Sequence, residues 1–500
     1  MKRFTTIQPP ASFSREGQNA LIGRRHASRS IARRPTEPAS PSVASRRASS
    51  SSAVYPLGRA STVEVDALVI GGGPIGLSTA YHLAAMHRGC DGSGIVVVER
   101  DPTYARSSAT LSAGGIRQQF SLKENVEMSL YGRDFLRRAH ELLRSNDDDD
   151  DDEEEVDVQF QEHGYLFLAA SEGGRDQLIR NNKTQRLAGC NDVTLLGRDE
   201  LERKFPWLNT TDIVLGSYGE RGEGWFDPWA LIRGLKKKCL SMGVTFVNGR
   251  PVSSRRDAEN DGGRVLSVDV LVEDRNVVRY NVNCVVNAAG AHCNGVMEIL
   301  AGKGGGGHGL AHPIPVEPRK RCIFFIHCNT SQGDLVPKIA PLTVCPTSGV
   351  YFRSEGSVGA NGETMGNFLC GVSPRRDVDR AIGDMNELDY ADHQLWDDVI
   401  WPALYHRVPA FGDVKVKSSW AGLYEYNTID QNAIIDFHPE MNNVIMANGF
   451  SGHGLQQSPA AGRAVSELIS CDGRFESLDL SIFSFERICN NRPIFETGIV

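Results

Sequence analysis

The stretch that decides the fold of this chain is Val65-Asp66-Ala67-Leu68-Val69-Ile70-Gly71-Gly72-Gly73-Pro74-Ile75-Gly76. Its first half is an apolar run typical of a buried strand, and its second half is a glycine turn that matches GxGxxG. Residues 74–88 continue with the apolar spacing of a helix, and residues 95–98 form a second β-branched strand. A strand, a helix and a strand in this order predict a βαβ unit and therefore a parallel sheet.

The context makes the glycine turn informative, since glycine clusters alone usually mark ordinary turns. Gly71 would permit the tight turn, Gly73 would let a pyrophosphate approach the backbone, and Gly76 would let the helix pack closely on the strand. Glu99, at the end of the second strand, would accept hydrogen bonds from ribose hydroxyls, and its charge would repel a 2′-phosphate. The motif predicts a dinucleotide site that disfavours NADP and does not separate FAD from NAD.

Two later apolar strands also end in small residues. Residues 284–290 read CVVNAAG, and residues 444–454 read VIMANGFSGHG. Glycine and alanine let a flat ligand approach the backbone closely. Three such turns in one chain favour a long cofactor that crosses several strand ends, and this favours FAD over NAD.

The remaining periodicity predicts further elements. Residues 122–143 and 228–242 have helical spacing, and Asp227 followed by Pro228 is a typical helix start. Nine consecutive acids at 147–155 repel one another and predict a solvated loop insertion rather than an acidic binding patch or a calcium site. Strands are predicted at 244–247, 265–272 and 277–282, with the last two paired.

Charge is distributed unevenly along the 500 residues, whose formal net charge is −8. Residues 1–62 carry eleven basic and two acidic side chains together with twelve serines, and residues 63–500 carry a net charge of −17. An Arg-rich, Ser-rich and acid-poor N-terminus predicts an organellar transit peptide, with a disordered basic tail as the alternative. The acidic body disfavours binding to nucleic acid.

Eleven cysteines are spread along the chain without a CxxC pair. This spacing is typical of an intracellular protein with neither a disulfide framework nor a zinc site. We therefore expect no metal site. The sequence contains no run of about 18 uncharged apolar residues, so no transmembrane segment is predicted.

Residues 63–500 resemble the D-amino-acid oxidase and sarcosine oxidase superfamily of flavoproteins, and within it most the mitochondrial FAD-dependent oxidoreductase domain-containing protein 1 family. The resemblance rests on an ordered set of motifs: VDALVIGGGPIGLSTAYHL, VVVERDPTY, LSAGGIRQQFS, GWFDPW, VVNAAGA, VEPRKR and NGFSGHGLQQSPAAGRAV. It implies an α/β fold, with a Rossmann-like, discontinuous FAD-binding domain and a second, substrate domain on a mainly antiparallel sheet. It also implies a mitochondrial flavoprotein needed for the assembly or stability of respiratory complex I, with an unsettled substrate.

By resemblance, the two domains alternate along the chain. The FAD-binding domain is expected at residues 63–150, 225–312 and 416–475. The substrate domain is expected at 151–224, together with the acidic insertion at 147–155, and at 313–415. Residues 1–62 would be the transit peptide and residues 476–500 a C-terminal tail.

The resemblance also implies residues that bind FAD. Relatives that attach flavin covalently use a His where this chain has Ser112, or a Cys before the third glycine turn, where residues 420–430 contain none. We therefore expect FAD to be bound non-covalently. The implied cofactor-binding residues are Gly71, Gly73, Pro74, Ile75, Gly76, Glu99, Arg100, Ser107, Ser108, Ala109, Val252, Ala289, Gly290, Gly449, Phe450, Ser451, Gly452, His453 and Gly454.

Three residues are candidates for catalysis. Arg117 resembles a position that binds the substrate carboxylate, and His453 would polarise the pyrimidine ring of the flavin or make a structural hydrogen bond. Gln456 stands where amino-acid oxidases of the superfamily have a carboxylate-binding Lys, and an amide cannot pair with a charge. The Lys that promotes reactivity with oxygen would fall near residues 368–370, which contain none. These differences predict a dehydrogenase rather than an oxidase.

Other polar residues are weaker candidates. Tyr424, Tyr426 and Asp430 precede the third turn and would line the pocket, although packing is the alternative for both tyrosines. Residues 319–321, Arg-Lys-Arg, would hold an anion or an acidic partner, but basic runs of this length are usually solvated.

Two hypotheses of function follow. The first is an enzyme that oxidises a secondary amine or an amino acid, with Arg117 as the carboxylate anchor and FAD as the hydride acceptor. The second is a binding protein whose flavin stabilises the fold and whose surface engages complex I subunits or assembly intermediates. A mitochondrion is the expected location, at the matrix or the matrix face of the inner membrane, with a plastid as the alternative.

Overall fold

The glycine turn follows β1 (Thr62–Ile70), a strand inside a seven-stranded sheet. The computed structural model describes residues 61–145, 156–257, 263–302, 310–329, 335–356, 366–375 and 377–497. The predicted transit peptide up to residue 60 and the acidic run at 147–155 lie outside the described residues.

The seven-stranded sheet has a parallel centre. β1 pairs in parallel with β2 (Ile95–Glu99) on one side and with β10 (Asn276–Asn287) on the other. β8 (Thr245–Arg256) continues the parallel arrangement beyond β2, and β17 (Met441–Asn448) continues it beyond β10. The antiparallel strands β16 (Ile434–His438) and β9 (Val265–Val272) complete the sheet. The carboxyl ends of β1, β2, β10 and β17 therefore meet at one edge, where ligands of such sheets bind.

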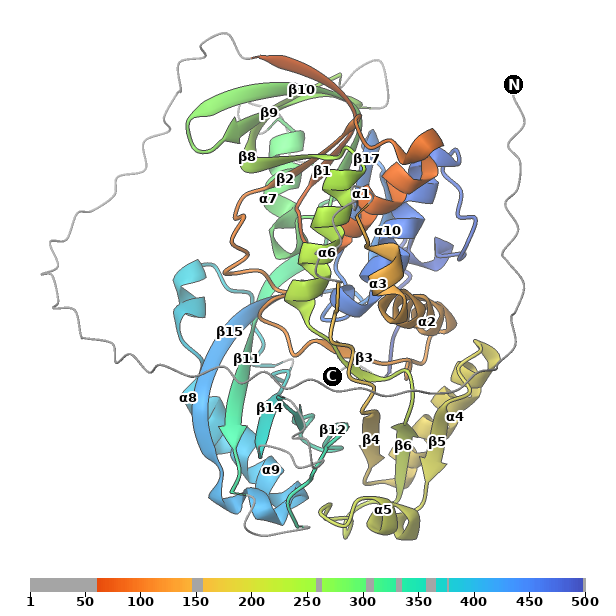
Figure 1. The fold of residues 1–500 in the computed structure, drawn as a ribbon, viewed down its shortest axis with the longest axis vertical. Coiled ribbons are helices and arrows are strands. Elements are labelled where there is room, and N and C mark those ends of the chain that lie inside the picture. Colours follow the sequence, from red (N-terminus) through yellow and green to blue (C-terminus); the bar gives the residue numbers. More distant parts are fainter. Residues whose placement is uncertain are drawn as a thin grey trace, which may run out of the picture. The chain divides into compact units, whose positions relative to one another are not determined.

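Both faces of this sheet are covered (Figure 1). Ala67 and Val69 of β1 pack in one core with α1 (Pro74–Met86) and α10 (Gly454–Ser470), and Leu68 and Ile70 pack in another core with α7 (Cys293–Leu300). This alternation is the period of two that a strand imposes on its side chains. α6 (Pro228–Ser241) packs beside α1, and Asp227 caps it by accepting a hydrogen bond from the backbone N–H of Trp229 at 2.8 Å.

The second sheet has eight strands in the order β15-β11-β14-β13-β12-β4-β6-β5. Neighbouring strands are antiparallel except β12 and β4, which are parallel. The predicted fold class, a Rossmann-like sheet and a mainly antiparallel sheet, is therefore confirmed. The strands are β4 (Tyr165–Ala169), β5 (Val193–Leu196), β6 (Leu215–Gly219), β11 (Val316–His327), β12 (Leu342–Val344), β13 (Tyr351–Ser354), β14 (Asn367–Gly371) and β15 (Lys415–Asn427).

Three elements differ from the sequence-based expectation. The helix expected at 122–143 is two helices, α2 (Lys123–Arg137) and α3 (Ala139–Leu142), because Arg138 between them has a ψ of 12°. β10 is one long strand because its first half pairs with β9 and its last residues pair with β17. β15, expected at the start of the third FAD-binding segment, pairs with β11 in the eight-stranded sheet.

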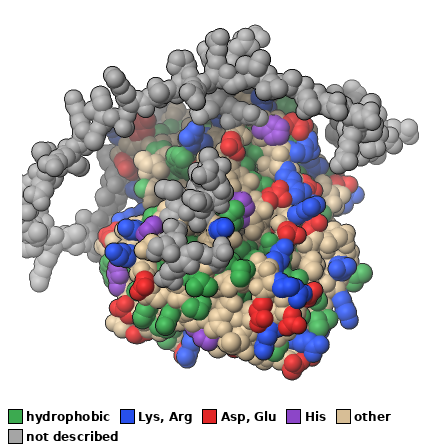
Figure 2. All heavy atoms as spheres, turned by 60° about the horizontal axis from the view of Figure 1, so that its bottom comes forward, with side chains coloured by type: hydrophobic (Ala, Val, Ile, Leu, Met, Phe, Trp, Pro, Cys, Tyr) green, Lys and Arg blue, Asp and Glu red, His purple; other side chains and the backbone are tan. Residues whose placement is uncertain are grey.

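The remaining elements are short or lie on the surface. A two-stranded ribbon of β3 (Gly115–Ile116) and β7 (Gly224–Trp225) accompanies the two sheets. On the face shown in Figure 2, basic and acidic side chains of the described residues lie interspersed. Other helical elements include α4 (Glu172–Leu187), α5 (Arg198–Lys204), α8 (His393–Leu395), α9 (Trp401–Arg407), α11 (Glu486–Cys489) and the short turns η2 (Gly290–His292) and η4 (Met385–Asp389). Across the described ranges, no helix has both the length and the apolar character needed to cross a bilayer.

Candidate functional site

A cavity of about 570 Å³ opens at the carboxyl edge of the seven-stranded sheet, and we call it the sheet-edge cavity. It is lined by the ends of β1, β2 and β10, by the first residues of α1 and α10, and by part of β15. Its volume lies within the range of about 300–1,000 Å³ that is typical of cofactor and small-molecule sites.

The three glycines that match the GxGxxG pattern, Gly71, Gly73 and Gly76, occupy different environments. Gly71 has a φ of +108°, and a Cβ there would lie 2.4 Å from the carbonyl oxygen of Ala288. A Cβ on Gly76 would lie 1.9 Å from the carbonyl oxygen of Gly71, so helix and turn touch through bare backbone. A Cβ on Gly73 would meet no atom within 4 Å, and Gly73 lines the cavity. Gly73 therefore leaves the space that a ligand needs at the start of α1.

Glu99 and Arg100 line the cavity at the end of β2. The Glu99 carboxylate accepts hydrogen bonds from the backbone N–H groups of Gly72 at 2.8 Å and Asp101 at 2.9 Å. A carboxylate has about four acceptor positions, so Glu99 can still accept hydrogen bonds from ribose hydroxyls. Arg100 donates to Nε2 of His292 at 2.8 Å, and burial, assisted by the charge of Arg100, lowers the pKa of His292 to about 4.

Two helices begin at this cavity. Gly73 is the N-cap residue of α1, and Gly454 is the first residue of α10. Helix N-termini present unpaired N–H groups and a partial positive charge, which suit anionic groups such as a diphosphate. Gly290, with a φ of +54° and no atom within 4 Å of an added Cβ, leaves further open space beside them.

The implied FAD residues divide into three groups. The residues that line the sheet-edge cavity are Gly71, Gly73, Pro74, Ile75, Glu99, Arg100, Ser107, Ser108, Ala109, Ala289, Gly290, Gly452 and Gly454. The cavity is not lined by Gly76, Val252, Gly449, Phe450 or Ser451, and the neighbours of Val252 that line it are Gly249, Arg250 and Pro251. His453 lies instead at a second cavity.

This second cavity, which we call the arginine cavity, has a volume of about 90 Å³. It lies beside β3 and is lined by residues of β4, β11, β12, β13 and β15 and by the first turn of α10. The two cavities are adjacent because they share lining residues, which are Ser108, Ser112, Leu423, Tyr424, Gly452 and Leu455.

Arg117 lies in the wall of the arginine cavity and is 2 % exposed. Its backbone N–H donates to Oε1 of Gln456 at 2.8 Å. Its guanidinium donates to the carbonyl oxygen of Gln119 at 2.7 Å and to Nε2 of His453 at 3.0 Å, and lies 4.1 Å from the ring centroid of Phe120. The guanidinium is therefore held in one position at the cavity wall.

The structure brings together the three residues proposed for catalysis. A guanidinium only donates hydrogen bonds, so Nε2 of His453 is the unprotonated nitrogen of the ring. Burial, together with the charge of Arg117, holds the pKa of His453 well below its ordinary value. Gln456 is 5 % exposed and lines the same cavity. A charged guanidinium, a neutral imidazole and an amide thus form one polar wall.

Glu223 lies behind this wall, and the sequence did not single it out. Its carboxylate accepts hydrogen bonds from the backbone N–H of Gln118 at 2.5 Å and from Nε2 of Gln119 at 2.7 Å. Burial raises the pKa of Glu223 to about 7, against the opposing effect of these hydrogen bonds and of Arg117. An isolated Glu in a loop carries no pattern, so only the tertiary structure reveals it.

Two more lining residues of the arginine cavity were also missed as site residues, Tyr165 on β4 and Tyr351 on β13. A third, Arg321 on β11, belongs to the run 319–321, which was a weaker candidate for holding an anion or an acidic partner. The interpretation of residues 319–321 as a solvated basic run is wrong for Arg321, which is 8 % exposed. Arg321 donates to both carboxylate oxygens of Asp379 at 2.8 Å each. A strand places its side chains on alternate faces, and here it turns one member of the run inward.

The residues before the third turn differ in role. Tyr424 lines both cavities, as the sequence suggested. Tyr426 lines neither cavity, and its ring centroid lies 4.9 Å from the guanidinium carbon of Arg319. Asp430 is also absent from both walls, because it is buried in an ion pair with Arg487 at 2.8 Å.

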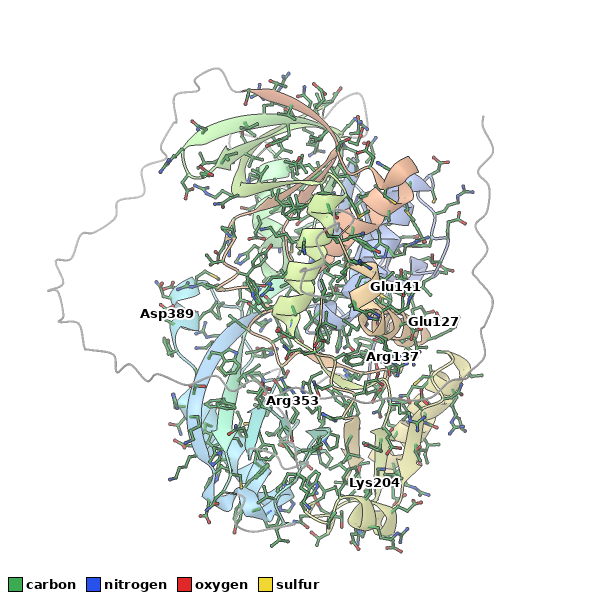
Figure 3. All side chains as sticks on the ribbon, viewed as in Figure 1. Glu127, Arg137, Glu141, Lys204, Arg353 and Asp389 are labelled. Atoms are coloured by element: carbon green, nitrogen blue, oxygen red, sulfur yellow. The ribbon has the colours of Figure 1, made fainter. Side chains whose placement is uncertain are left out.

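Ion pairs and hydrogen bonds tie the two cavities to the surrounding strands. Arg106, at the sheet-edge cavity, pairs with Asp389 of η4 at 2.6 Å, and Asp389 is labelled in Figure 3. Arg353 of β13, also labelled there, donates from Nε to the carbonyl oxygen of Ala113, which lines the arginine cavity, at 3.0 Å. The loop that carries Ser112 is thus anchored to the eight-stranded sheet.

Neither cavity has a lysine or a cysteine among its described lining residues. Residues 368–370, the region that corresponds by resemblance to the oxygen-activating Lys of the oxidases, lie in β14. Within the part of the chain that the structure describes, no group of His, Cys, Asp and Glu residues could hold a metal ion.

The sequence family described as FAD dependent oxidoreductase (DAO) matches residues 66–468 of this chain. The chain belongs to this family. FAD is the cofactor, and the sheet-edge cavity fits it: Gly73 and Gly290 leave open space, two helix N-termini suit the diphosphate, and Glu99 suits a ribose.

The chain is similar to several named proteins. A Xenopus laevis protein named FAD-dependent oxidoreductase domain-containing protein 1 is 43 % identical over 458 residues, which cover 89 % of this chain and 87 % of that protein. Monomeric sarcosine oxidase of Bacillus sp. (strain B-0618) is 24 % identical, with 87 % of this chain and 99 % of that protein covered. The structure of L-proline dehydrogenase from P. horikoshii shares the fold, with a TM-score of 0.68 and 21 % identity. The match covers 86 % of this chain and 99 % of that chain.

Proposed function

We propose that this oxidoreductase oxidises a small secondary amine or amino acid and that it acts as a dehydrogenase. The observation that carries the proposal is the adjacency of the two cavities. The arginine cavity holds a fixed guanidinium and shares six lining residues with the sheet-edge cavity. A carboxylate bound at Arg117 would therefore hold the rest of a small ligand against the cofactor cavity.

Each residue of the polar wall has a separate role in this proposal. Arg117 binds the substrate carboxylate through charge-assisted hydrogen bonds. His453, as a neutral acceptor, orients the guanidinium, and Oε1 of Gln456 fixes the backbone of Arg117. When bound, FAD supplies the acceptor for the hydride. Positioning of the substrate is thus the contribution of this chain, and positioning accelerates reactions by holding the reacting atoms in contact.

The absence of lysine from the described walls of both cavities supports a dehydrogenase. We expect substrate to reduce the flavin quickly without oxygen, and the reduced protein to form peroxide slowly in air. An anaerobic screen of secondary amines and amino acids, read as loss of flavin absorbance at ~450 nm, tests the proposal. Absence of bleaching with every compound would contradict amine oxidation, and rapid peroxide formation would contradict the dehydrogenase assignment.

We also propose that FAD is bound non-covalently. Ser112 occupies the loop position at which relatives carry a flavin-linked His, and no cysteine belongs to the described lining of either cavity. Precipitation with acid should release FAD into the supernatant. Flavin that stays attached to the denatured chain would contradict this.

A second candidate function is a role in the assembly of mitochondrial respiratory complex I, in which FAD stabilises the fold and turnover is small or absent. Gln456 in place of a lysine favours it, because the amide weakens the grip on a carboxylate. Complementation with Arg117→Met separates the candidates. Normal complex I assembly by a variant that retains FAD but is not reduced by substrate would favour the assembly role, and failed assembly would favour catalysis.

The mitochondrial location belongs to the same proposal and rests on the composition of residues 1–62. Fusion of these residues to a fluorescent protein should direct it to mitochondria. Accumulation in plastids or in the cytosol would contradict this location.

A further inference from the structure

Arg321 is a second guanidinium in the wall of the arginine cavity. It lies on β11, whereas Arg117 follows β3, and the face of its guanidinium lies 4.7 Å from the ring centroid of Tyr424. Both arginines act electrostatically on Tyr424, which lies in the wall of the same cavity. The two cations therefore border one small space.

The hydrogen bonds of Arg321 leave part of its donor set unused. Its two Nη atoms donate to the Asp379 carboxylate, and Nη1 also donates to the carbonyl oxygen of Lys320 at 2.9 Å. Its Nε is buried and has no hydrogen-bond partner among the described residues. These bonds occupy three of the five N–H donors of the guanidinium and Nε is enclosed by protein, so one N–H of Nη2 is the donor left for a ligand.

Burial of the Arg321–Asp379 ion pair costs desolvation free energy. The two side chains are 9 % and 7 % exposed. Apolar residues of similar volume usually replace a buried ion pair without loss of stability, so stability alone does not account for this one. Its position at a cavity wall points to a ligand.

Three tyrosines complete this wall: Tyr165, Tyr351 and Tyr424. Burial raises the pKa of all three, so the hydroxyls remain protonated and can donate. The cavity therefore combines two guanidinium groups with neutral hydroxyl donors.

The charges around the cavity indicate what it accepts. Arg117 and Arg321 are the charged residues among its described lining, and His453 is neutral. Asp379 balances the charge of Arg321, and Glu223, whose pKa burial raises to about 7, interacts electrostatically with Arg117. A ligand with one anionic group would pair that group with Arg117. A second anionic group would lie beside Arg321, whose charge Asp379 already compensates.

We propose that Arg321, balanced by Asp379, binds a neutral hydrogen-bond acceptor of the substrate. The substrate is then a small amino acid or N-substituted amino acid that carries an uncharged polar group, such as an amide, a carbonyl or a hydroxyl. This inference rests on the proposed function, in which Arg117 holds the carboxylate. The volume of the cavity, about 90 Å³, has room for roughly six to nine water-sized groups and so restricts the ligand to a small one.

The test uses three isosteric ligands that cannot be oxidised as amines: succinamate, succinate and 4-methylpentanoate. Each has one carboxylate for Arg117 and ends in an amide, a carboxylate or an isopropyl group. Their dissociation constants are measured on the FAD-loaded protein from the change in the flavin absorbance spectrum. Succinamate should bind about tenfold more tightly than the other two, since a polar site rejects ligands that leave its donors unpaired.

Two substitutions assign the preference to the ion pair. Arg321→Met should abolish the advantage of succinamate over 4-methylpentanoate. Asp379→Asn should uncover the charge of Arg321 and make succinate about tenfold tighter than succinamate. The double variant Arg321→Met, Asp379→Leu replaces the pair by apolar groups and keeps the fold testable if either single variant is unstable. FAD content and the circular dichroism spectrum report folding in every case.

Three results would overturn the proposal: tighter binding of succinate to the wild type, unchanged ligand ratios in Arg321→Met and in the double variant, or no binding of any of the three ligands. The ligand ratios do not depend on turnover. If no amine reduces the flavin while the ratios follow the prediction, the proposed oxidation fails and the Arg321 subsite stands. If amines reduce the flavin and the variants have the ligand ratios of the wild type, the proposed oxidation stands and the Arg321 subsite fails.

Discussion

The sheet-edge cavity and the arginine cavity are neighbours that are built in different ways. The sheet-edge cavity is shaped by backbone, through the glycines of three turns and the first residues of two helices. The arginine cavity is shaped by residues from five strands of the other sheet and by the start of α10. A backbone-built site accepts any ligand of the right shape and charge, whereas a side-chain-built site is specific to a chemistry. The sheet-edge cavity is therefore the part typical of the family, and the arginine cavity is the part that determines which substrate binds.

The largest effect is expected from adding one methyl group to the glycine turn at the sheet-edge cavity. In Gly76→Ala the new Cβ would lie 1.9 Å from the carbonyl oxygen of Gly71. We expect loss of FAD and a fall in the free energy of unfolding of about 1–3 kcal/mol or more, because the helix must move away from the turn. FAD content and denaturant unfolding of the apoprotein measure both effects.

Gly73→Ala is the matched control for this change. Gly73 has a φ of −72°, and its added Cβ would meet no protein atom within 4 Å. The apoprotein should unfold as the wild type does, while FAD binds more weakly because the methyl group enters the cavity. Equal FAD content in Gly73→Ala, Gly76→Ala and the wild type would show that the sheet-edge cavity is not where FAD binds.

A substitution in the arginine cavity should change substrate binding and not FAD binding. Arg117→Met should weaken substrate binding by about 10²-fold, as expected for loss of a buried charge-assisted contact, and should leave FAD content unchanged. The measurement is the substrate dependence of anaerobic flavin reduction. Arg137→Met, which removes a partly exposed pair with Glu162 outside both cavities, should have no effect on reduction. Loss of FAD in Arg117→Met would erase the distinction between the two sites.

A carboxyl group at each cavity, Glu223 fully buried and Glu425 half-buried, predicts a pH dependence that sharpens the comparison. Burial raises the pKa of Glu223, behind the arginine cavity, and of Glu425, in the sheet-edge cavity, to about 7. Between the ordinary pKa of a Glu and pH 7 the folded state holds more protons than the unfolded state. Stability should therefore fall as pH rises from about 4.5 to 7, by at most about 3 kcal/mol for each group.

Denaturant unfolding at pH 5 and pH 8 measures this slope. Glu223→Gln should flatten it and also reduce the pH dependence of substrate binding, since Glu223 holds Gln118 and Gln119 beside Arg117. Glu425→Gln, which keeps an acceptor for the backbone N–H of Gly449, should flatten it and reduce the pH dependence of FAD binding. A slope that neither substitution changes would contradict the assignment of these carboxyls.

The smallest expected effect comes from outside both cavities. Asp227→Ala removes the cap of α6 and should lower the free energy of unfolding by about 1 kcal/mol, without changing FAD content or reduction. Lys204→Ala, at the exposed Lys204–Glu220 pair, should change stability by less than about 0.5 kcal/mol. A change in flavin reduction in either variant would mean that the arginine cavity depends on distant surface elements.

The sequence was a good guide wherever short-range physics decides the structure. The run 65–76 predicted β1, its turn and α1, because apolar period, glycine and helix spacing are local signals. Asp227-Pro228 predicted the start of α6 for the same reason. Arg117, His453 and Gln456 were found through the resemblance to a family, and only the structure shows that they touch.

The sequence was a poor guide wherever a neighbour from a distant part of the chain decides. The helix expected at 122–143 breaks at Arg138, and β10 is longer than predicted because it serves two partner strands. Arg321 was interpreted as part of a solvated run, yet it is buried against Asp379, 58 residues further along the chain. Hydropathy describes whether a side chain favours water or the protein interior, whereas pairing between strands determines which residues it contacts.

The sequence by itself determined the family, the FAD fold and the position of the dinucleotide turn, because each glycine acts through its own backbone. The tertiary structure decided which side chains face the substrate. β4, β11, β13 and β15 bring Tyr165, Arg321, Tyr351 and Tyr424 to one wall although they are spread over more than half of the chain. Strand pairing is a long-range interaction, so the chemistry of this wall is set by register and cannot be read from neighbours along the chain.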